Sequence, residues 1–176
     1  MKKLFALVLT LCLLCGCAAF AEDGNSMNWS DAEAKLAEFG LSGEFVVLDM
    51  LGLKVWVPEG MVATEVSEAD AAAGRLALFF DAEKNSYLAV DAANVEGLTL
   101  DSYYESAMNT EGLSSVAMVS FNGLNGVAYK SETANFWSVS LVDTNSNLIN
   151  FVSGPADDEN CYIVFSAIVA SIQPAE

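Results

Sequence analysis

The chain has 176 residues, of which 53% are hydrophobic, and it carries a formal net charge of −17 at pH 7 with no histidine. The acidic balance argues against nucleic acid as a partner and against docking on anionic lipid, because both need basic patches that neutralise phosphate. The lack of histidine removes the commonest general base, the Ser-His and Cys-His nucleophile pairs, and histidine-ligated zinc.

Residues 1–21 are predicted to be a bacterial signal peptide. Lys2 and Lys3 precede an apolar run over residues 4–15, and small residues follow it. The run is shorter than the roughly 20 residues that a membrane-spanning helix needs, so the sequence favours an export signal over a transmembrane anchor. We therefore expect an extracytoplasmic protein.

Two cleavage sites fit this segment. Residues 19–21, Ala-Phe-Ala, match the small-x-small rule, and cleavage there would release a soluble chain that begins at Glu22. Residues 14–17, Leu-Cys-Gly-Cys, resemble a lipobox in which Cys17 would carry a lipid, although Cys15 is an unusual occupant of its position. The first match is the better one. The protein is thus predicted to be secreted, or to be held at the cell surface by a lipid on Cys17 as its only membrane contact.

The remaining chain is acidic and suits one domain. All 24 acidic residues but only five of the seven basic ones follow Ala21, which gives this part a net charge of −19. Cys161 is its only cysteine, so no internal disulfide is expected and burial of apolar surface must hold the fold. We expect residues 22–43 to form a tether and a helix, and residues 44–176 to form the main domain.

The N-terminal helix has start and stop signals. Ser30 and Glu33 have the spacing of a capping box. Gly40 stands where a left-handed residue would end the helix, with Leu41 placed to contact Leu36. The polar and acidic residues before it are predicted to be a loose tether.

Two hairpins and a short helix follow in chain order. Residues 44–57 are predicted to form two strands that close at Gly52, and residues 75–91 a second hairpin. Between them, residues 67–74 carry a cap residue, an alanine-rich middle and a glycine stop, which is typical of one or two helical turns.

Two longer helices are predicted on either side of the strands at 114–153. The first runs over residues 99–109 and can be capped by Thr99. Its apolar side consists of Leu100, Tyr103, Tyr104 and Met108. The second follows the acidic residues 157–159, which suit a helix N-terminus. Its apolar face consists of Cys161, Phe165, Ile168 and Ile172, joined by Val164 and Val169. A helix with one such face must pack on the sheet.

The strongest strand signal lies between these two helices. Four runs rich in β-branched and aromatic residues are bounded by Asn, Gly, Asp, Ser or Thr, at residues 114–121, 126–131, 135–142 and 148–153. In the third run, Trp137, Val139 and Leu141 alternate with two serines, which is the period of a strand with one face in a core. The predicted fold class is therefore α+β, with an antiparallel sheet of about six to eight strands and helices packed on its faces.

Four segments match a known pattern of elements. Residues 45–58 match an entry hairpin ending at proline, and residues 98–107 match a helix after the second hairpin. Residues 119–123 match a strand followed by Asn-Gly, and residues 168–173 match the end of a closing helix. In this order the chain resembles the PsbP-like fold. That fold is named for an oxygen-evolving accessory subunit of photosystem II, and it is shared by a eukaryotic Ran-binding import factor and by small exported Firmicutes proteins of unknown function. The resemblance implies a PsbP-like sandwich over residues 43–173, and it assigns no binding residue.

Asp143, Asn145 and Asn147 are the candidate metal ligands. They reproduce the D-x-N-x-N opening of a calcium loop, in which oxygen ligands at alternating positions suit a hard cation. The remainder of that loop is missing, since Leu148 stands where glycine is needed and Gly154 where glutamate is needed. A polar hairpin turn explains the same residues.

The sequence predicts no catalytic residue and no cofactor. Cys161 falls on the apolar face of the last helix, where burial leaves a thiol inert. One group of aromatic residues can form either core or a ligand cleft between sheet and helix: Trp56, Tyr103, Tyr104, Phe136 and Trp137.

The leading functional hypothesis is an exported, non-enzymatic binding or accessory domain at the bacterial cell surface, with an unknown protein or small ligand as its partner. The alternative is a small-molecule or calcium-binding protein that uses the Asp143 loop or the aromatic cleft.

Overall fold

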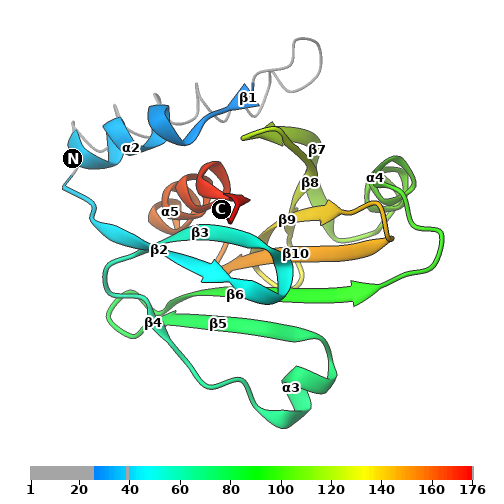
Figure 1. Ribbon diagram of the computed structural model, residues 1–176, viewed down its shortest axis with the longest axis horizontal. Helices are drawn as coiled ribbons and strands as arrows, with labels where there is room; N and C mark the ends of the chain where they lie inside the picture. The colour runs from blue at the N-terminus through cyan, green and yellow to red at the C-terminus, as the bar shows by residue number, and fades with distance from the viewer. Residues whose placement is uncertain (1–25, 39, 176) are drawn as a thin grey trace.

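The computed structural model describes residues 26–38 and 40–175, and it has the predicted α+β class (Figure 1). The predicted signal peptide and Cys17 lie outside the described residues. The first elements are β1 (Ser26–Met27), α2 (Trp29–Glu38), β2 (Gly43–Leu48), a 3-10 turn (Asp49–Leu51), β3 (Leu53–Pro58), β4 (Val62–Ala63) and α3 (Glu68–Ala72). They are followed by β5 (Arg75–Asp81), β6 (Ser86–Asn94), α4 (Leu100–Met108), β7 (Leu113–Phe121), β8 (Leu124–Ser131), β9 (Phe136–Val142), β10 (Asn147–Gly154), α5 (Glu159–Ser171) and β11 (Gln173–Pro174).

The larger sheet has eight strands in the order β1-β7-β8-β9-β10-β6-β5-β4. Seven of them are antiparallel, and β1 adds to β7 in parallel. Val139 at the centre lies opposite Ala128 on one side and Phe151 on the other. The four strands predicted between residues 114 and 153 are confirmed as this sheet's consecutive strands.

The first hairpin forms a separate, smaller sheet, which the sequence did not predict. Strands β2 and β3 pair through the predicted turn at Gly52, whose φ is +60°. The C-terminal strand β11 then pairs with the other edge of β3, with Gln173 opposite Lys54. The end of the chain therefore closes this sheet, in the order β11-β3-β2.

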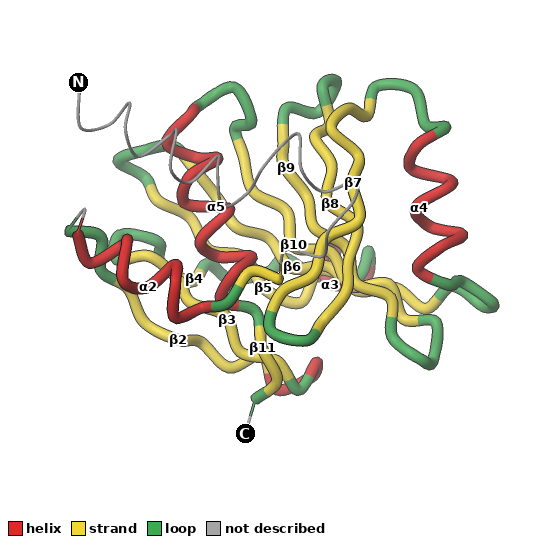
Figure 2. The backbone as a smooth tube through the Cα atoms, turned by 90° about the horizontal axis from the view of Figure 1, so that it is seen from above, coloured by secondary structure: helices red, strands yellow, loops and turns green. Residues whose placement is uncertain are grey.

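Helix α5 lies between the two sheets instead of covering one of them. It contacts β7, β9 and β10 of the large sheet on one side, and β3 and α2 on the other. Figure 2 shows α5 and α4 on opposite sides of β7, β8 and β9. The predicted face is buried, as expected, but so are Ile163, Ala167, Ala170 and Ser171 on the remaining faces. The prediction of a single apolar face was too narrow, because a second layer covers the outer side of the helix.

The N-terminal helix begins slightly earlier than predicted. It starts at Trp29, so Ser30 lies within its first turn instead of capping it. Its C-terminus is confirmed, because Gly40 has φ +67° and the backbone N–H of Leu41 donates to the carbonyl of Leu36 at 3.0 Å. Leu36 belongs to the same core as the large sheet.

The predicted loose tether is wrong at its end. Ser26 and Met27 pair with β7 opposite Ser120 and Phe121. This pairing gives the backbone N–H and C=O groups of β1 hydrogen-bond partners in β7. The polar sequence of this segment gave no sign of a strand.

The other predicted caps are present. Ser67 accepts from the backbone N–H of Asp70 at 3.1 Å at the start of α3, and Thr99 forms a capping box with Ser102 at the start of α4. Met108 was placed on the apolar side of α4, but 55% of it is exposed, and Ala107 is buried in its place.

Both faces of β9 are buried. Trp137, Val139 and Leu141 face the main core, as predicted. Ser138 and Ser140, on the opposite face, are also fully buried. The Oγ of Ser140 lies 3.1 Å from the hydroxyl of Tyr103 on α4, and burial is the main cause that raises the pKa of Tyr103. Helix α4 therefore covers the face of β9 that the alternating pattern did not place in the core.

Candidate functional site

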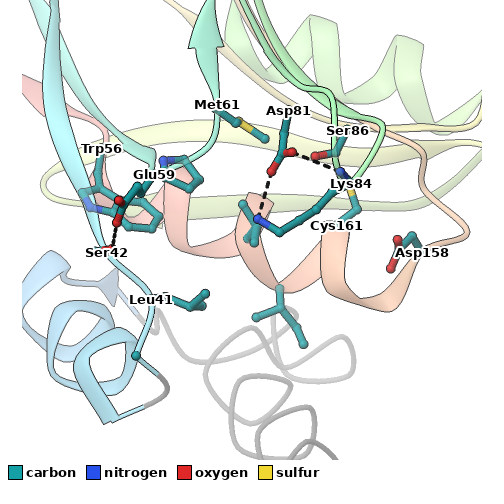
Figure 3. Close-up of a pocket in the computed structure, with 14 residues that line it drawn as sticks. Leu41, Ser42, Trp56, Glu59, Met61, Asp81, Lys84, Ser86, Asp158 and Cys161 are labelled. Atoms are coloured by element: carbon teal, nitrogen blue, oxygen red, sulfur yellow. Dashed lines mark hydrogen bonds and ion pairs between the residues drawn. The ribbon is translucent and has the colours of Figure 1, made fainter.

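A cavity of about 660 Å³ lies where α5 begins, beside the smaller sheet (Figure 3). Four chain segments form it: the α2–β2 loop, the end of β3 with the loop that follows, the β5–β6 turn, and the first turns of α5. Its apolar wall consists of Leu41, Trp56, Pro58, Met61, Ile163 and Val164. Six polar side chains complete the lining, but they occupy less of its surface than the apolar ones do, which is typical of a small-molecule site.

The β5–β6 turn supplies a buried carboxylate and a lysine. Asp81 is the last residue of β5, and its side chain is only 5% exposed. It accepts hydrogen bonds from the backbone N–H groups of Glu83 and Lys84, both at 3.0 Å, and from Lys84 Nζ at 2.9 Å. The Lys84 ammonium, together with these N–H groups, lowers the pKa of Asp81. The carboxylate therefore stays charged, and it holds the turn in shape.

The opposite loop approaches Asp81 closely at a glycine. Gly60 has φ +100°, and a Cβ at this position would lie 3.2 Å from Asp81 Oδ2. Any other residue would be strained by its φ and crowded against the carboxylate. The loop between β3 and β4 can therefore approach Asp81 this closely only with glycine at position 60.

A second carboxylate ties two loops of the cavity together. The hydroxyl of Ser42 donates to Glu59, and the backbone N–H of Glu59 donates to the carbonyl of Ser42 at 2.8 Å. In Figure 3, Glu59 and Ser42 lie near Trp56, while Asp158 lies at the other end of the view beside Cys161. These bonds fix the α2–β2 loop against the end of β3.

Cys161 lies in the cavity wall but has the properties of a structural thiol. It is 5% exposed, and its Sγ lies 3.8 Å from Ser153 Oγ. Burial is the main cause that raises its pKa, and the negative charges of Asp157 and Asp158 act in the same direction. The thiolate form needed for nucleophilic chemistry is disfavoured.

The candidate calcium loop forms a tight turn between β9 and β10. The Oδ1 of Asp143 accepts from the backbone N–H groups of Asn145 at 2.8 Å and Asn147 at 2.9 Å, and its Oδ2 accepts from Asn147 Nδ2 at 2.7 Å. The amide of Asn147 lowers the pKa of Asp143 most strongly. Asn94 also donates to Asn147 Oδ1 at 2.9 Å. The turn bonds account for the side chains of Asp143 and Asn147, and a cation would have to displace them.

The described residues hold no group of three or more His, Cys, Asp or Glu side chains placed to bind a metal ion. The choice of Asp143, Asn145 and Asn147 as ligands stays a prediction.

The structure separates the aromatic residues proposed to form one cleft. Trp56 lines the cavity and packs against Trp29, with ring centroids 5.8 Å apart. Three others, Tyr103, Tyr104 and Phe136, pack in a second core beneath α4, on the opposite face of the large sheet. Trp137 packs against Tyr162 of α5, with centroids 4.7 Å apart.

Sequence reasoning missed most of this cavity. Asp81, Glu59 and Met61 carry no motif, and they come from different loops. The one available signal was Asp81 at the end of a strand, three residues before Lys84, because an aspartate often bonds to backbone N–H groups of its own turn.

The chain matches no family model and no curated protein. In the part of the chain that the structure describes, no helix is long and apolar enough to cross a membrane.

Proposed function

We propose that the chain is an exported, non-enzymatic binding module at the cell surface that holds a small ligand in the cavity beside α5. The cavity carries this proposal. Its volume of about 660 Å³ is within the range of about 300–1,000 Å³ of small-molecule sites, and its wall is mostly apolar with a few converging polar groups.

A non-enzymatic role is supported by the chemistry of the wall. The sequence holds no histidine, and the thiol of Cys161 is buried with a raised pKa. Asp81 is a carboxylate of lowered pKa held by hydrogen bonds, which makes it a poor proton acceptor. These groups suit recognition more than proton transfer.

We propose further that the architecture is PsbP-like. The order of elements supports this reading: a hairpin ending at Pro58, a second hairpin, α4, four antiparallel strands and the closing helix α5. The fold alone names no ligand, because one fold can host many functions.

Export is tested at the N-terminus. Mass spectrometry of the chain recovered from its host should show a mature form that begins at Glu22, or a diacylated Cys17. A chain that retains Met1 through Ala21 and is found in the cytoplasm would refute the export proposal.

Ligand binding is tested by filling the cavity. Val164 lines the cavity on α5, so Val164→Trp should occupy its space. The matched control is Val95→Trp, because Val95 is 42% exposed in the β6–α4 loop. A fragment library is screened by thermal shift on all three proteins. We expect fragments that stabilise the wild type to lose their effect in Val164→Trp and keep it in Val95→Trp. Fragments that stabilise all three equally would show that the cavity is not the site.

A further inference from the structure

The charges on the cavity wall select for one class of ligand. The described lining residues include three carboxylates, from Glu59, Asp81 and Asp158, and a single cation, Lys84. The wall is therefore negative unless some of these charges cancel.

One carboxylate and the lysine cancel each other. Lys84 Nζ lies 2.9 Å from Asp81 Oδ2, and the Asp81 side chain is only 5% exposed. An anionic ligand that drew Lys84 away would leave this buried carboxylate with two backbone N–H groups and no counter-ion. Removing the partner of a buried charge is costly, so Lys84 stays with Asp81. Its side chain is 56% exposed and its ammonium has two further donors, but the pair as a whole carries no net charge to attract an anion.

Glu59 supplies the negative charge that remains for a ligand. Glu59 is exposed and accepts one hydroxyl hydrogen bond from Ser42, and a carboxylate can accept about four, so it retains capacity for a donor from a ligand. Asp158 stands just before the start of α5. The helix dipole at the N-terminus of α5 attracts anions, but the negative charge of Asp158 repels them.

The rest of the protein acts in the same direction. The chain has a net charge of −17, and the part after Ala21 carries −19. A field of this sign raises the local concentration of cations in a cleft with low-dielectric walls. Apolar side chains such as Met61 and Val164 cover the space between the charged groups, so the ligand also needs an apolar body.

We propose that the cavity binds an organic amine, with its apolar body against the wall and its ammonium or guanidinium group at Glu59. This rests on the proposed function, in which the cavity is the ligand site. It adds that recognition depends on positive charge.

Three probes share a phenylalkyl body and differ in the charge of the end group: 4-phenylbutylammonium, 4-phenylbutan-1-ol and 4-phenylbutyrate. They separate the effect of ligand charge on affinity from the effect of burying the apolar body. Isothermal titration calorimetry on the mature chain should give the tightest binding for the ammonium, about fivefold weaker binding for the alcohol, and the weakest for the carboxylate. The fivefold factor follows from an exposed ion pair worth up to about 1 kcal/mol.

Charge reversal tests the location. Glu59→Lys should weaken ammonium binding and strengthen carboxylate binding, and Glu59→Gln should remove most of the difference between ammonium and alcohol. The control Glu111→Lys makes the same change of net charge in the turn after α4, and it should behave as the wild type. Circular dichroism checks that each variant is folded.

Equal binding of all three probes would overturn the amine proposal and leave the cavity as the ligand site. Tightest binding of the carboxylate would overturn it as well. Binding of none of the probes would refute the proposed function together with the amine proposal. A loss of selectivity in Glu111→Lys equal to that in Glu59→Lys would refute the location.

Discussion

Asn122 joins three parts of the fold that are far apart in the sequence. Its Oδ1 accepts a hydrogen bond from the backbone N–H of Trp29 at 3.2 Å, at the start of α2. Its Nδ2 donates to the carbonyls of Ala170 at 2.7 Å and Ile172 at 2.9 Å, at the end of α5. The last carbonyls of a helix have no partner within the helix, so this side chain supplies one.

Asn122→Ala should lower the free energy of unfolding by about 2.5–5.5 kcal/mol. Three hydrogen bonds at about 0.5–1.5 kcal/mol each account for about 1.5–4.5 kcal/mol of this. The backbone at residue 122 has φ +46°, and alanine in this left-handed region adds about 1 kcal/mol. The total is a large fraction of the about 5–15 kcal/mol that stabilises a typical domain.

The control separates backbone strain from lost hydrogen bonds. Asn85, in the β5–β6 turn, has φ +50°, and its side chain makes no hydrogen bond within the described residues. Asn85→Ala should therefore cost only about 1 kcal/mol. Urea unfolding followed by tryptophan fluorescence measures both variants, with the m-value expected to stay unchanged. Equal losses in the two variants would refute the role of the Asn122 side chain.

Three further predictions concern the polar groups. Asp81→Asn should lower the free energy of unfolding at pH 7, and its difference from the wild type should disappear as the pH falls below about 4. The reason is that a carboxylate whose folded pKa is lowered contributes stability only while it is ionised. A difference in unfolding free energy that stays constant from pH 7 to acid would contradict this. Added calcium should leave the melting temperature unchanged in the wild type and in Asp143→Ala, since bonds within the turn already occupy this carboxylate; a calcium-dependent rise that the variant abolishes would restore the metal site. Cys161 should react with a thiol reagent only when the protein is unfolded in denaturant, because its thiol is buried; rapid labelling of the native protein would show an accessible thiolate.

The predictions that succeeded depend on neighbouring residues. Gly40, Gly52 and Gly74 all have positive φ and stand at the predicted ends of elements. Thr99 caps α4 with its own backbone neighbours. A cap or a turn is decided by the φ and ψ of a few residues and by bonds within them, so the sequence contains the necessary information.

The predictions that failed depend on what covers a side chain. The pattern of β9 predicted one face in a core, but Ser140 on the other face is also buried and lies against Tyr103 of α4. The outer side of α5 was assigned no partner, but β3 and α2 pack there, and the backbone N–H of Trp56 donates to Ser171 Oγ at 2.8 Å. Periodicity indicates which residues share a face, and it does not indicate how many layers the domain stacks on that face.

By itself, the sequence determined the α+β class, the consecutive strands β7 to β10, most helix and turn boundaries, and the negative net charge. Only the tertiary structure decided that α5 lies between two sheets, and that Glu59, Asp81 and Cys161 line one cavity. The physical reason is distance along the chain. Caps and strand periods are local interactions, whereas a cavity exists only after long-range packing brings separate loops together and leaves space between them.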